Sequence, residues 1–188
     1  MRKSPKRQHL IEVAARLFNR LGYHAAGIDQ VIAEAGIAKT TLYRHFQSKE
    51  DLIVAVLKQI DGEFREAMRA YVDAAAKTPD QRLLAAFDYL ESWFGDASFY
   101  GCPFVSAAAE YAERPSPVFQ EAAMHKRLMI AYFEELARAA GMPEPVRIAE
   151  EIHLLHEGAI AIAHVNGDPS AAVKAKAMAE RLLVNSGA

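Results

Sequence analysis

Seven side chains between residues 39 and 49 have the chemistry needed to contact a polyanion. Each can donate a hydrogen bond to a phosphate or a base edge, and none is acidic. An ordinary surface helix would include Asp or Glu at some of these positions. The set consists of Lys39, Thr40, Thr41, Tyr43, Arg44, His45 and Lys49. We therefore predict that this segment contacts DNA.

Two short helices joined by a tight turn are expected to position these side chains. Val31 and Ala35 give the first helix an apolar face, and Gly36 then allows the chain to turn with a positive φ. Leu42 and Phe46, four residues apart, give the second helix its own apolar face. This arrangement is typical of a helix-turn-helix, whose second helix enters the major groove of DNA.

The segment AGIAKTTLYRHFQSKEDL resembles the TetR family of one-component transcription regulators. The resemblance covers about residues 8–58, and its Leu-Tyr-x-x-Phe-x-x-Lys core is specific to the family. Four positions depart from the usual pattern. Ala38 stands for a Ser and Thr40 for a Gly, while Gly27 stands for the Thr that commonly caps the preceding helix and Ile32 for an Ala. The resemblance implies a homodimer that binds double-stranded operator DNA and responds to a small-molecule effector.

Composition and charge agree with a globular DNA-binding protein. The 188 residues are 52% hydrophobic and 24% charged, and a single Cys excludes an intrachain disulfide. The first 50 residues hold 9 Lys or Arg against 4 Asp or Glu, whereas the remainder holds 13 against 20. We expect the basic part to face DNA and the acidic part to be held away from it. No signal peptide or membrane span is expected, so we predict a cytoplasmic protein.

The fold class predicted from the sequence is all-α. Helix start signals recur at Ser4-Pro5, Thr78-Pro79, Ser116-Pro117 and Asp168-Pro169, and no segment alternates with a period of two. The expected helices after the recognition helix span about 48–76, 79–94, 103–113, 117–140, 145–165 and 169–184. We predict a three-helix DNA-binding domain at 1–47 and a larger helical domain for effector binding and dimerisation at 48–188.

Apolar residues occupy more than one face of the segments 117–140 and 145–165, which indicates more than one packing partner. In proteins of the resembled family, these helices form a four-helix bundle with a second chain. The predicted interface residues are Phe119, Tyr132, Ile152, Leu155, Gly158 and Ala161. The alternative is a central helix buried inside one domain.

Aromatic residues are dense between 87 and 111, where polar groups are few. Such a composition suits a pocket for an apolar or amphipathic effector, although packing of the domain core explains most of these residues equally well. The predicted effector-binding residues are Trp93, Phe94, Phe104, Tyr111, His125 and His156.

Two further readings of the sequence compete with a ligand-responsive repressor. His153 and His156 have the spacing of two metal ligands on one helical face, so a helical metal-binding protein or metal-dependent enzyme is the alternative. The other reading is a DNA-binding architectural protein without an effector. No nucleotide-binding or hydrolase motif occurs, so we predict no enzyme activity, no cofactor and no metal site. Cys102 has no Lys, Arg or His close in sequence, which favours inert packing.

Overall fold

The computed structural model describes residues 4–186 and is all-α. The predicted domains also include residues 1–3 and 187–188, which lie outside the described residues. Over residues 4–186 the helices are α1 (Pro5–Leu21), α2 (Ile28–Ala35), α3 (Lys39–His45), α4 (Lys49–Ala75), α5 (Pro79–Phe94), α6 (Pro103–Glu110), α7 (Pro117–Ala139), α8 (Pro145–Asn166) and α9 (Ala171–Asn185).

Helix boundaries follow local signals in the sequence. Proline lies in the first turn of α1, α5 and α8. Backbone N–H groups there have no acceptor within the helix, so the N–H that proline lacks costs no hydrogen bond. Two boundaries differ from the prediction. The helix α6 ends at Glu110 rather than near 113. The helix α9 begins at Ala171 rather than Pro169, because the Asp168 side chain accepts hydrogen bonds from Ser170 and forms a turn before the helix.

The chain divides into two compact units. Unit 1 comprises Met1–Gly62 and Pro103–His125, and unit 2 comprises Glu63–Cys102 and Lys126–Ala188. The divisions fall inside α4, immediately before α6 and inside α7. By its contacts, the helix α6 therefore belongs with the N-terminal helices, although the 40 residues of unit 2 at 63–102 separate it from them along the chain.

Unit 1 contains the helix-turn-helix around a small apolar core. Fully buried Leu17, Val31 and Leu42 come from α1, α2 and α3 in turn. Gly36 has a φ of 63°, the left-handed conformation that lets the chain turn sharply between α2 and α3. The sequence prediction of a helix-turn-helix over this segment is thus confirmed.

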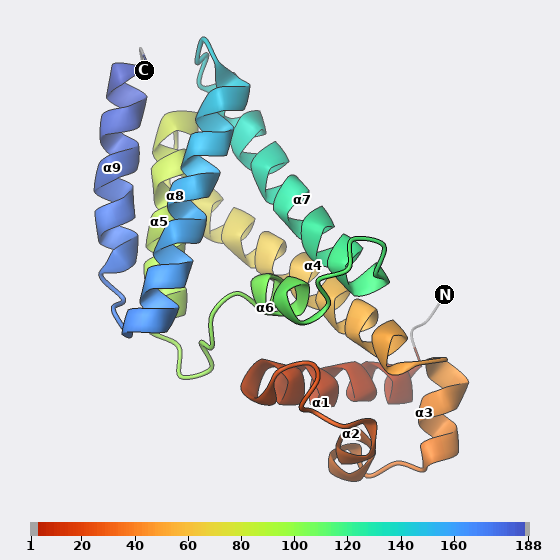
Figure 1. Ribbon diagram of the computed structural model, residues 1–188. Helices are drawn as coiled ribbons and strands as arrows, with labels where there is room; N and C mark the ends of the chain where they lie inside the picture. The colour runs from red at the N-terminus through yellow and green to blue at the C-terminus, as the bar shows by residue number, and fades with distance from the viewer. Residues whose placement is uncertain (1–3, 187–188) are drawn as a thin grey trace. The chain divides into compact units, whose positions relative to one another are not determined.

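Unit 2 is built on three helices that lie side by side, α5, α8 and α9 (Figure 1). Phe87 and Ile152 are fully buried, and Leu183 of α9 is only 4% exposed. An ion pair between Lys176 and Asp88, at 2.7 Å, links α9 to α5. In the part of the chain that the structure describes, no helix is long and apolar enough to cross a membrane.

Candidate nucleic-acid interface and ligand-sensing residues

The recognition helix α3 is held by two apolar anchors. Leu42 is fully buried and Phe46, directly after the helix, is 3% exposed. The Arg7 guanidinium lies over the Phe46 ring at 5.1 Å. These anchors turn the opposite face of α3 outward, so the predicted DNA-binding residues are presented to solvent. Lys39, Thr40, Tyr43 and Arg44 are exposed, and Thr41, His45 and Lys49 are partly exposed.

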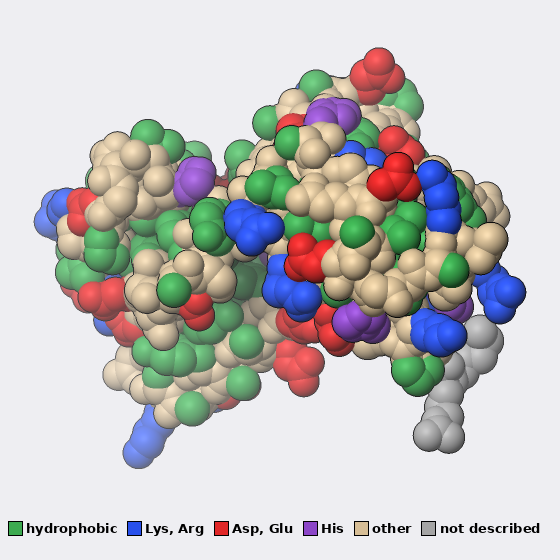
Figure 2. All heavy atoms as spheres, turned by 90° about the horizontal axis from the view of Figure 1, so that it is seen from below, with side chains coloured by type: hydrophobic (Ala, Val, Ile, Leu, Met, Phe, Trp, Pro, Cys, Tyr) green, Lys and Arg blue, Asp and Glu red, His purple; other side chains and the backbone are tan. Residues whose placement is uncertain are grey.

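Two of the predicted DNA-binding lysines already have partners in the free protein. Lys39 Nζ lies 3.0 Å from Asp29 Oδ1, and the hydrogen bond to Asp29 raises the pKa of Lys39. Lys49 Nζ donates to the His24 carbonyl oxygen at 3.1 Å. An exposed ion pair is weak, so the contact between Lys39 and Asp29 costs little to break. Figure 2 shows basic side chains on the surface near the start of the described chain, with acidic side chains interspersed.

A reciprocal cap fixes the start of α4 immediately after α3. Ser48 Oγ accepts from the Asp51 backbone N–H at 3.1 Å, and Asp51 Oδ2 accepts from the Gln47 backbone N–H at 3.1 Å. These bonds satisfy amide groups that a helix start would otherwise leave without acceptors. The position of the recognition helix is therefore tied to the first turn of a 27-residue helix.

Three of the predicted effector-binding residues belong to unit 1. Phe104 and His125 stack with ring centroids 3.6 Å apart and an angle of 7°. His125 Nδ1 lies 2.7 Å from Asp61 Oδ1, and both side chains are buried. Tyr111 stacks on His24 instead, at 4.6 Å. Burial, followed by the nearby carboxylates of Glu50 and Glu110, raises the pKa of Tyr111 to about 12.

The other three predicted effector-binding residues belong to unit 2. Trp93 contacts Phe64 and Phe99 edge to face, with centroids 5.2 and 4.9 Å apart. Phe94 also contacts the Phe99 ring, at 5.0 Å. His156 packs edge to face on Phe87 and Phe133. Within each unit the predicted residues thus have aromatic neighbours.

Buried polar groups in unit 2 include His153, one of the two histidines with the spacing of metal ligands. His153 is 9% exposed, and no hydrogen-bond partner reaches its Nδ1 atom. Burial lowers the pKa of His153, because it disfavours the charged form of the ring. Lys126 Nζ, close enough to His153 to influence that pKa, bonds to Glu157 Oε2 at 2.6 Å. The sequence gives no indication of the bond between Lys126 and Glu157, because these two residues lie 31 positions apart.

Cys102 has a cationic neighbour that its sequence surroundings did not indicate. Lys126 Nζ lies 3.2 Å from Cys102 Sγ, although the two residues are 24 positions apart. The thiol is buried. No cation lies close to Cys102 in the sequence, but folding brings Lys126 of α7 next to it.

The metal-binding alternative finds no ligand set among residues 4–186. No group of three or more His, Cys, Asp or Glu side chains there is arranged to hold a metal ion. His153 and His156 both pack against the Phe133 ring, with centroids 6.3 and 5.5 Å away. Their three-residue spacing therefore reflects packing against a common aromatic partner.

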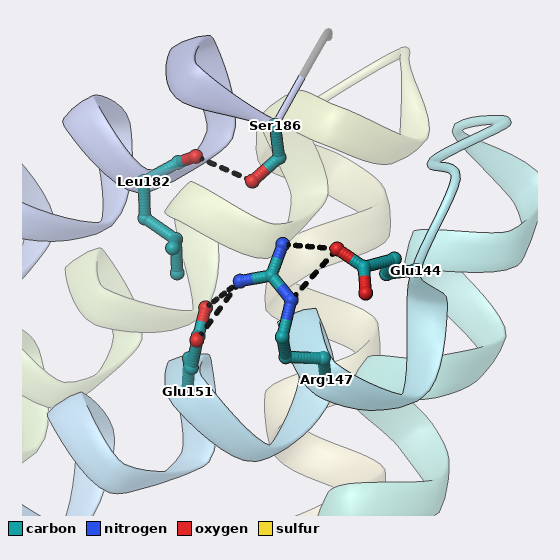
Figure 3. Close-up of polar contacts among 5 residues, drawn as sticks. All are labelled: Glu144, Arg147, Glu151, Leu182 and Ser186. Carbon is teal, nitrogen blue, oxygen red and sulfur yellow. Dashed lines mark hydrogen bonds and ion pairs between the residues drawn. The ribbon is translucent and has the colours of Figure 1, made fainter.

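A shallow surface groove of about 370 Å³ lies where α7 leads into α8. It is lined by Arg138, Glu144, Pro145, Val146, Arg147 and Glu150. Within this lining, Arg147 bonds to Glu144 on one side, and on its other side it bonds to Glu151 (Figure 3). These hydrogen bonds raise the pKa of Arg147. Because the charged groups are mutually neutralised and exposed, the groove does not suit an apolar ligand.

The predicted dimer residues differ in exposure within the chain. Ile152 is fully buried and Tyr132 is 4% exposed, so the chain's own helices already cover both. Phe119 and Leu155 are partly exposed, whereas Gly158 and Ala161 are exposed. The exposed side of α8 also carries Leu154 and Val165, at 72% and 79% exposure. Covered and exposed apolar faces on one helix match the predicted two-faced pattern.

An all-α chain with a helix-turn-helix near its start and a helical remainder defines a class of DNA-binding regulators. Residues 10–56 match the family model described as bacterial regulatory proteins, tetR family. Residues 79–179, more than half of the chain, match the tetracyclin repressor-like C-terminal domain. The chain therefore belongs to the TetR family of transcription regulators, which are not enzymes.

A solved structure and two curated relatives illustrate the family likeness. A TetR-family regulator from Streptomyces coelicolor is 30% identical, with a TM-score of 0.86 over 97% of this chain and 96% of that one. The transcriptional activator FasR of Mycolicibacterium smegmatis is 31% identical over 74% of this chain and 63% of its own length. The transcriptional repressor DhaR of a Mycobacterium species is 30% identical over 44% of this chain and 42% of its own length. The chain thus spans less than two thirds of these two relatives.

Proposed function

We propose that the chain is a ligand-responsive repressor that binds double-stranded operator DNA as a homodimer. Residues 1–47 bind the operator, and residues 48–188 bind the effector and dimerise. The observation that supports DNA binding most strongly is the outward face of α3, which carries hydrogen-bond donors and cations but no carboxylate. Acting on chromosomal DNA places the protein in the cytoplasm.

Side chains on α3 divide into two roles in this proposal. Lys39, Thr40 and Thr41, at the start of the helix, contact base edges, since the N-terminal residues of a recognition helix lie deepest in the groove. Tyr43 and His45 bind phosphates and orient the helix. Arg44, exposed on α3, and Lys49, at the start of α4, add positive charge for the DNA backbone.

Dimerisation is supported by the apolar side of α8 that the chain leaves uncovered. Leu154, Gly158, Ala161 and Val165 recur at spacings of four, three and four, so they share one helical face. Large apolar residues so exposed are costly in water unless another surface covers them. A second copy of the chain would present the same face, as a twofold interface requires.

The effector in this proposal is apolar or amphipathic. It contacts aromatic residues from the set Trp93, Phe94, Phe104 and Tyr111, and His125 or His156 orients it. Regulation follows from differential affinity, because a ligand that prefers the conformer unable to bind DNA shifts the population away from the operator. The long helix α4 joins the recognition helix to the remainder of the chain, so in this proposal it transmits the conformational change to the recognition helix.

Activation is the second candidate for the sign of regulation, since the name of the M. smegmatis relative describes an activator. A reporter gene behind the operator that the chain selects in vitro separates the two. Expression of the chain lowers reporter output if it represses and raises it if it activates. Unchanged output with an occupied operator would overturn both forms of the proposal.

A further inference from the structure

The helix α6 is bound to the turn between α1 and α2 through one carboxylate. Glu110, the last residue of α6, accepts a hydrogen bond from the Tyr23 backbone N–H through Oε1 at 2.9 Å. Its Oε2 accepts from the His24 backbone N–H at 2.5 Å. Hydrogen bonds to a charged acceptor are about twice as strong as neutral ones. A single side chain thus satisfies two consecutive amides of the α1–α2 turn.

The turn is shaped to admit this carboxylate. Gly22 has a φ of 89°, and a Cβ built on it would lie 3.1 Å from Glu110 Oε1. Glycine at this position therefore provides both the backbone conformation and the space that the carboxylate occupies. The backbone at 22–24 is therefore complementary to the Glu110 carboxylate in both shape and hydrogen bonding.

Additional contacts hold both ends of α6 to the same turn. The Tyr23 hydroxyl donates to the carbonyl oxygen of Pro103, the first residue of α6, at 3.0 Å. At the other end, the His24 ring stacks on Tyr111, and its Nε2 lies 2.8 Å from the Glu110 carbonyl oxygen. The His24 carbonyl oxygen in turn accepts from Lys49 at the start of α4. Two consecutive residues of this turn, Tyr23 and His24, therefore connect α6, α1 and the start of α4.

We propose that Glu110 is a positioning residue for the DNA-binding helices. Its carboxylate couples α6 to the helix-turn-helix, so that the state of the ligand-sensing domain is transmitted through this contact. The chain enters α6 directly from unit 2 at Cys102, and a displacement of α6 must either move the α1–α2 turn or break its bonds to Glu110. This inference rests on the proposed function, since it assumes that DNA binding and ligand sensing are coupled.

Coupling between two sites is reciprocal, which allows a test without the effector. If α6 and the helix-turn-helix are coupled, DNA binding must alter α6. The probe is an operator duplex that the wild-type chain selects from a random library. Amide hydrogen exchange is followed in peptides covering 22–27 and 103–111, with and without the duplex. The variants are Glu110→Gln and Glu110→Ala, and the matched control is Glu113→Gln, which removes an exposed carboxylate three residues further along.

In the wild type and in Glu113→Gln, the duplex should slow exchange across 103–111. In Glu110→Gln the free protein should melt cooperatively, exchange at 22–27 should rise about tenfold because the charged acceptor is lost, and the operator-induced protection of 103–111 should disappear. Glu110→Ala should show the same losses.

Three results would overturn the inference. In the first, the duplex slows amide exchange across 103–111 in Glu110→Gln as much as in the wild type. In the second, the duplex does not slow this exchange in the wild type. The third is loss of cooperative melting in both variants, which would make Glu110 a requirement for folding. Failure of the wild type to select any sequence is a different outcome, because it contradicts the proposed function itself.

Discussion

Individual side chains on α3 have distinct expected effects on DNA binding. Tyr43 is 46% exposed, and its hydroxyl is available for a phosphate. We predict that Tyr43→Phe weakens binding to all sequences to a similar degree, because a phosphate contact carries no sequence information. Thr40→Ala and Lys39→Ala should instead change base preference, with about 1–3 kcal/mol lost at the affected base pair.

Binding measured against an operator library distinguishes these effects. Arg16→Ala removes an exposed cation on α1 and is the control for loss of positive charge outside α3. The role assignment is incorrect if Lys39, Thr40 and Thr41 can all be replaced with no change in either affinity or preference.

The buried His153 should make stability depend on pH. Its folded-state pKa lies below the ordinary histidine value of 6.5, so in acid the unfolded chain takes up a proton before the folded chain does. The stability contribution of neutral His153 is therefore present above pH 6.5 and is lost as the pH falls through the folded-state pKa. We predict that His153→Gln, which cannot ionise, flattens the fall in melting temperature between about pH 7 and pH 5.

Melting curves of wild type and variant across that range provide the measurement. His9→Gln is the matched control, because the His9 side chain is exposed. A parallel fall in melting temperature for wild type and His153→Gln would show that His153 does not titrate differently in the two states.

Sequence patterns could indicate the outward residues of α3 but not their partners. The apolar spacing of Leu42 and Phe46 is enough to say which face of a short helix is buried. The bonds from Lys39 to Asp29 and from Lys126 to Cys102 and Glu157 join residues 10 to 31 positions apart. Such contacts depend on how helices pack, and no local pattern encodes them.

Among the helices, α8 is the one whose substitution tests dimerisation most directly. A Cβ built on Gly158 meets nothing within 4 Å, so a larger side chain fits the isolated chain. We predict that Gly158→Leu folds but gives a monomer with reduced operator affinity, because overpacking a helix crossing typically costs about 1–3 kcal/mol. The measurement is analytical ultracentrifugation at micromolar concentration.

Gly62→Leu is the matched control for this variant. Gly62 also lies within a helix and is exposed, and a Cβ there likewise meets nothing within 4 Å. It should retain the wild-type oligomeric state. A wild type that sediments as a monomer would contradict the dimer, and a dimeric Gly158→Leu would place the interface elsewhere.

Helix existence and extent could be predicted closely from the sequence, because proline and glycine mark most of the ends. The helix over 79–94 was predicted with the bounds observed. The late start of α9 could not be predicted as well, because Pro169 fits a first helical turn and a preceding turn equally well. Only the bonds from Ser170 to Asp168 show which of the two forms.

At the scale of the whole molecule, chain order does not determine which helices pack together. Both α6 and residues 117–125 of α7 belong to unit 1, although they lie within the region that matches the C-terminal domain. A linear division at residue 47 could not predict this, because the bonds of Tyr23 and His24 to Glu110 span 86 or 87 positions. The predicted domain limits remain a proposal about function.

Ligand sensing predicts linked changes in stability and DNA binding. A panel of apolar and amphipathic compounds should include members that raise the melting temperature of the free protein and lower its operator affinity together. Trp93 is the only tryptophan, so its fluorescence reports directly on unit 2. Trp93→Phe keeps an aromatic ring against Phe64 and Phe99 and should alter the response to such ligands while leaving DNA binding near normal.

The control is a polar set of compounds, such as sugars, that bury poorly in an aromatic site. Compounds that shift the melting temperature without changing operator affinity would contradict an effector role. A fully unfolded Trp93→Phe would show that Trp93 belongs to the structural core.

The central claim is sequence-specific DNA binding by a twofold dimer, and selection from a random duplex library followed by footprinting tests it most directly. The account predicts enrichment of an inverted repeat, with the two half-sites on one face of the duplex and separated by about one helical turn or a multiple of it. Affinity for that repeat should fall steeply with added salt, because phosphate contacts release counterions. Equal binding to all sequences, or enrichment of a single unpaired half-site, would contradict the account.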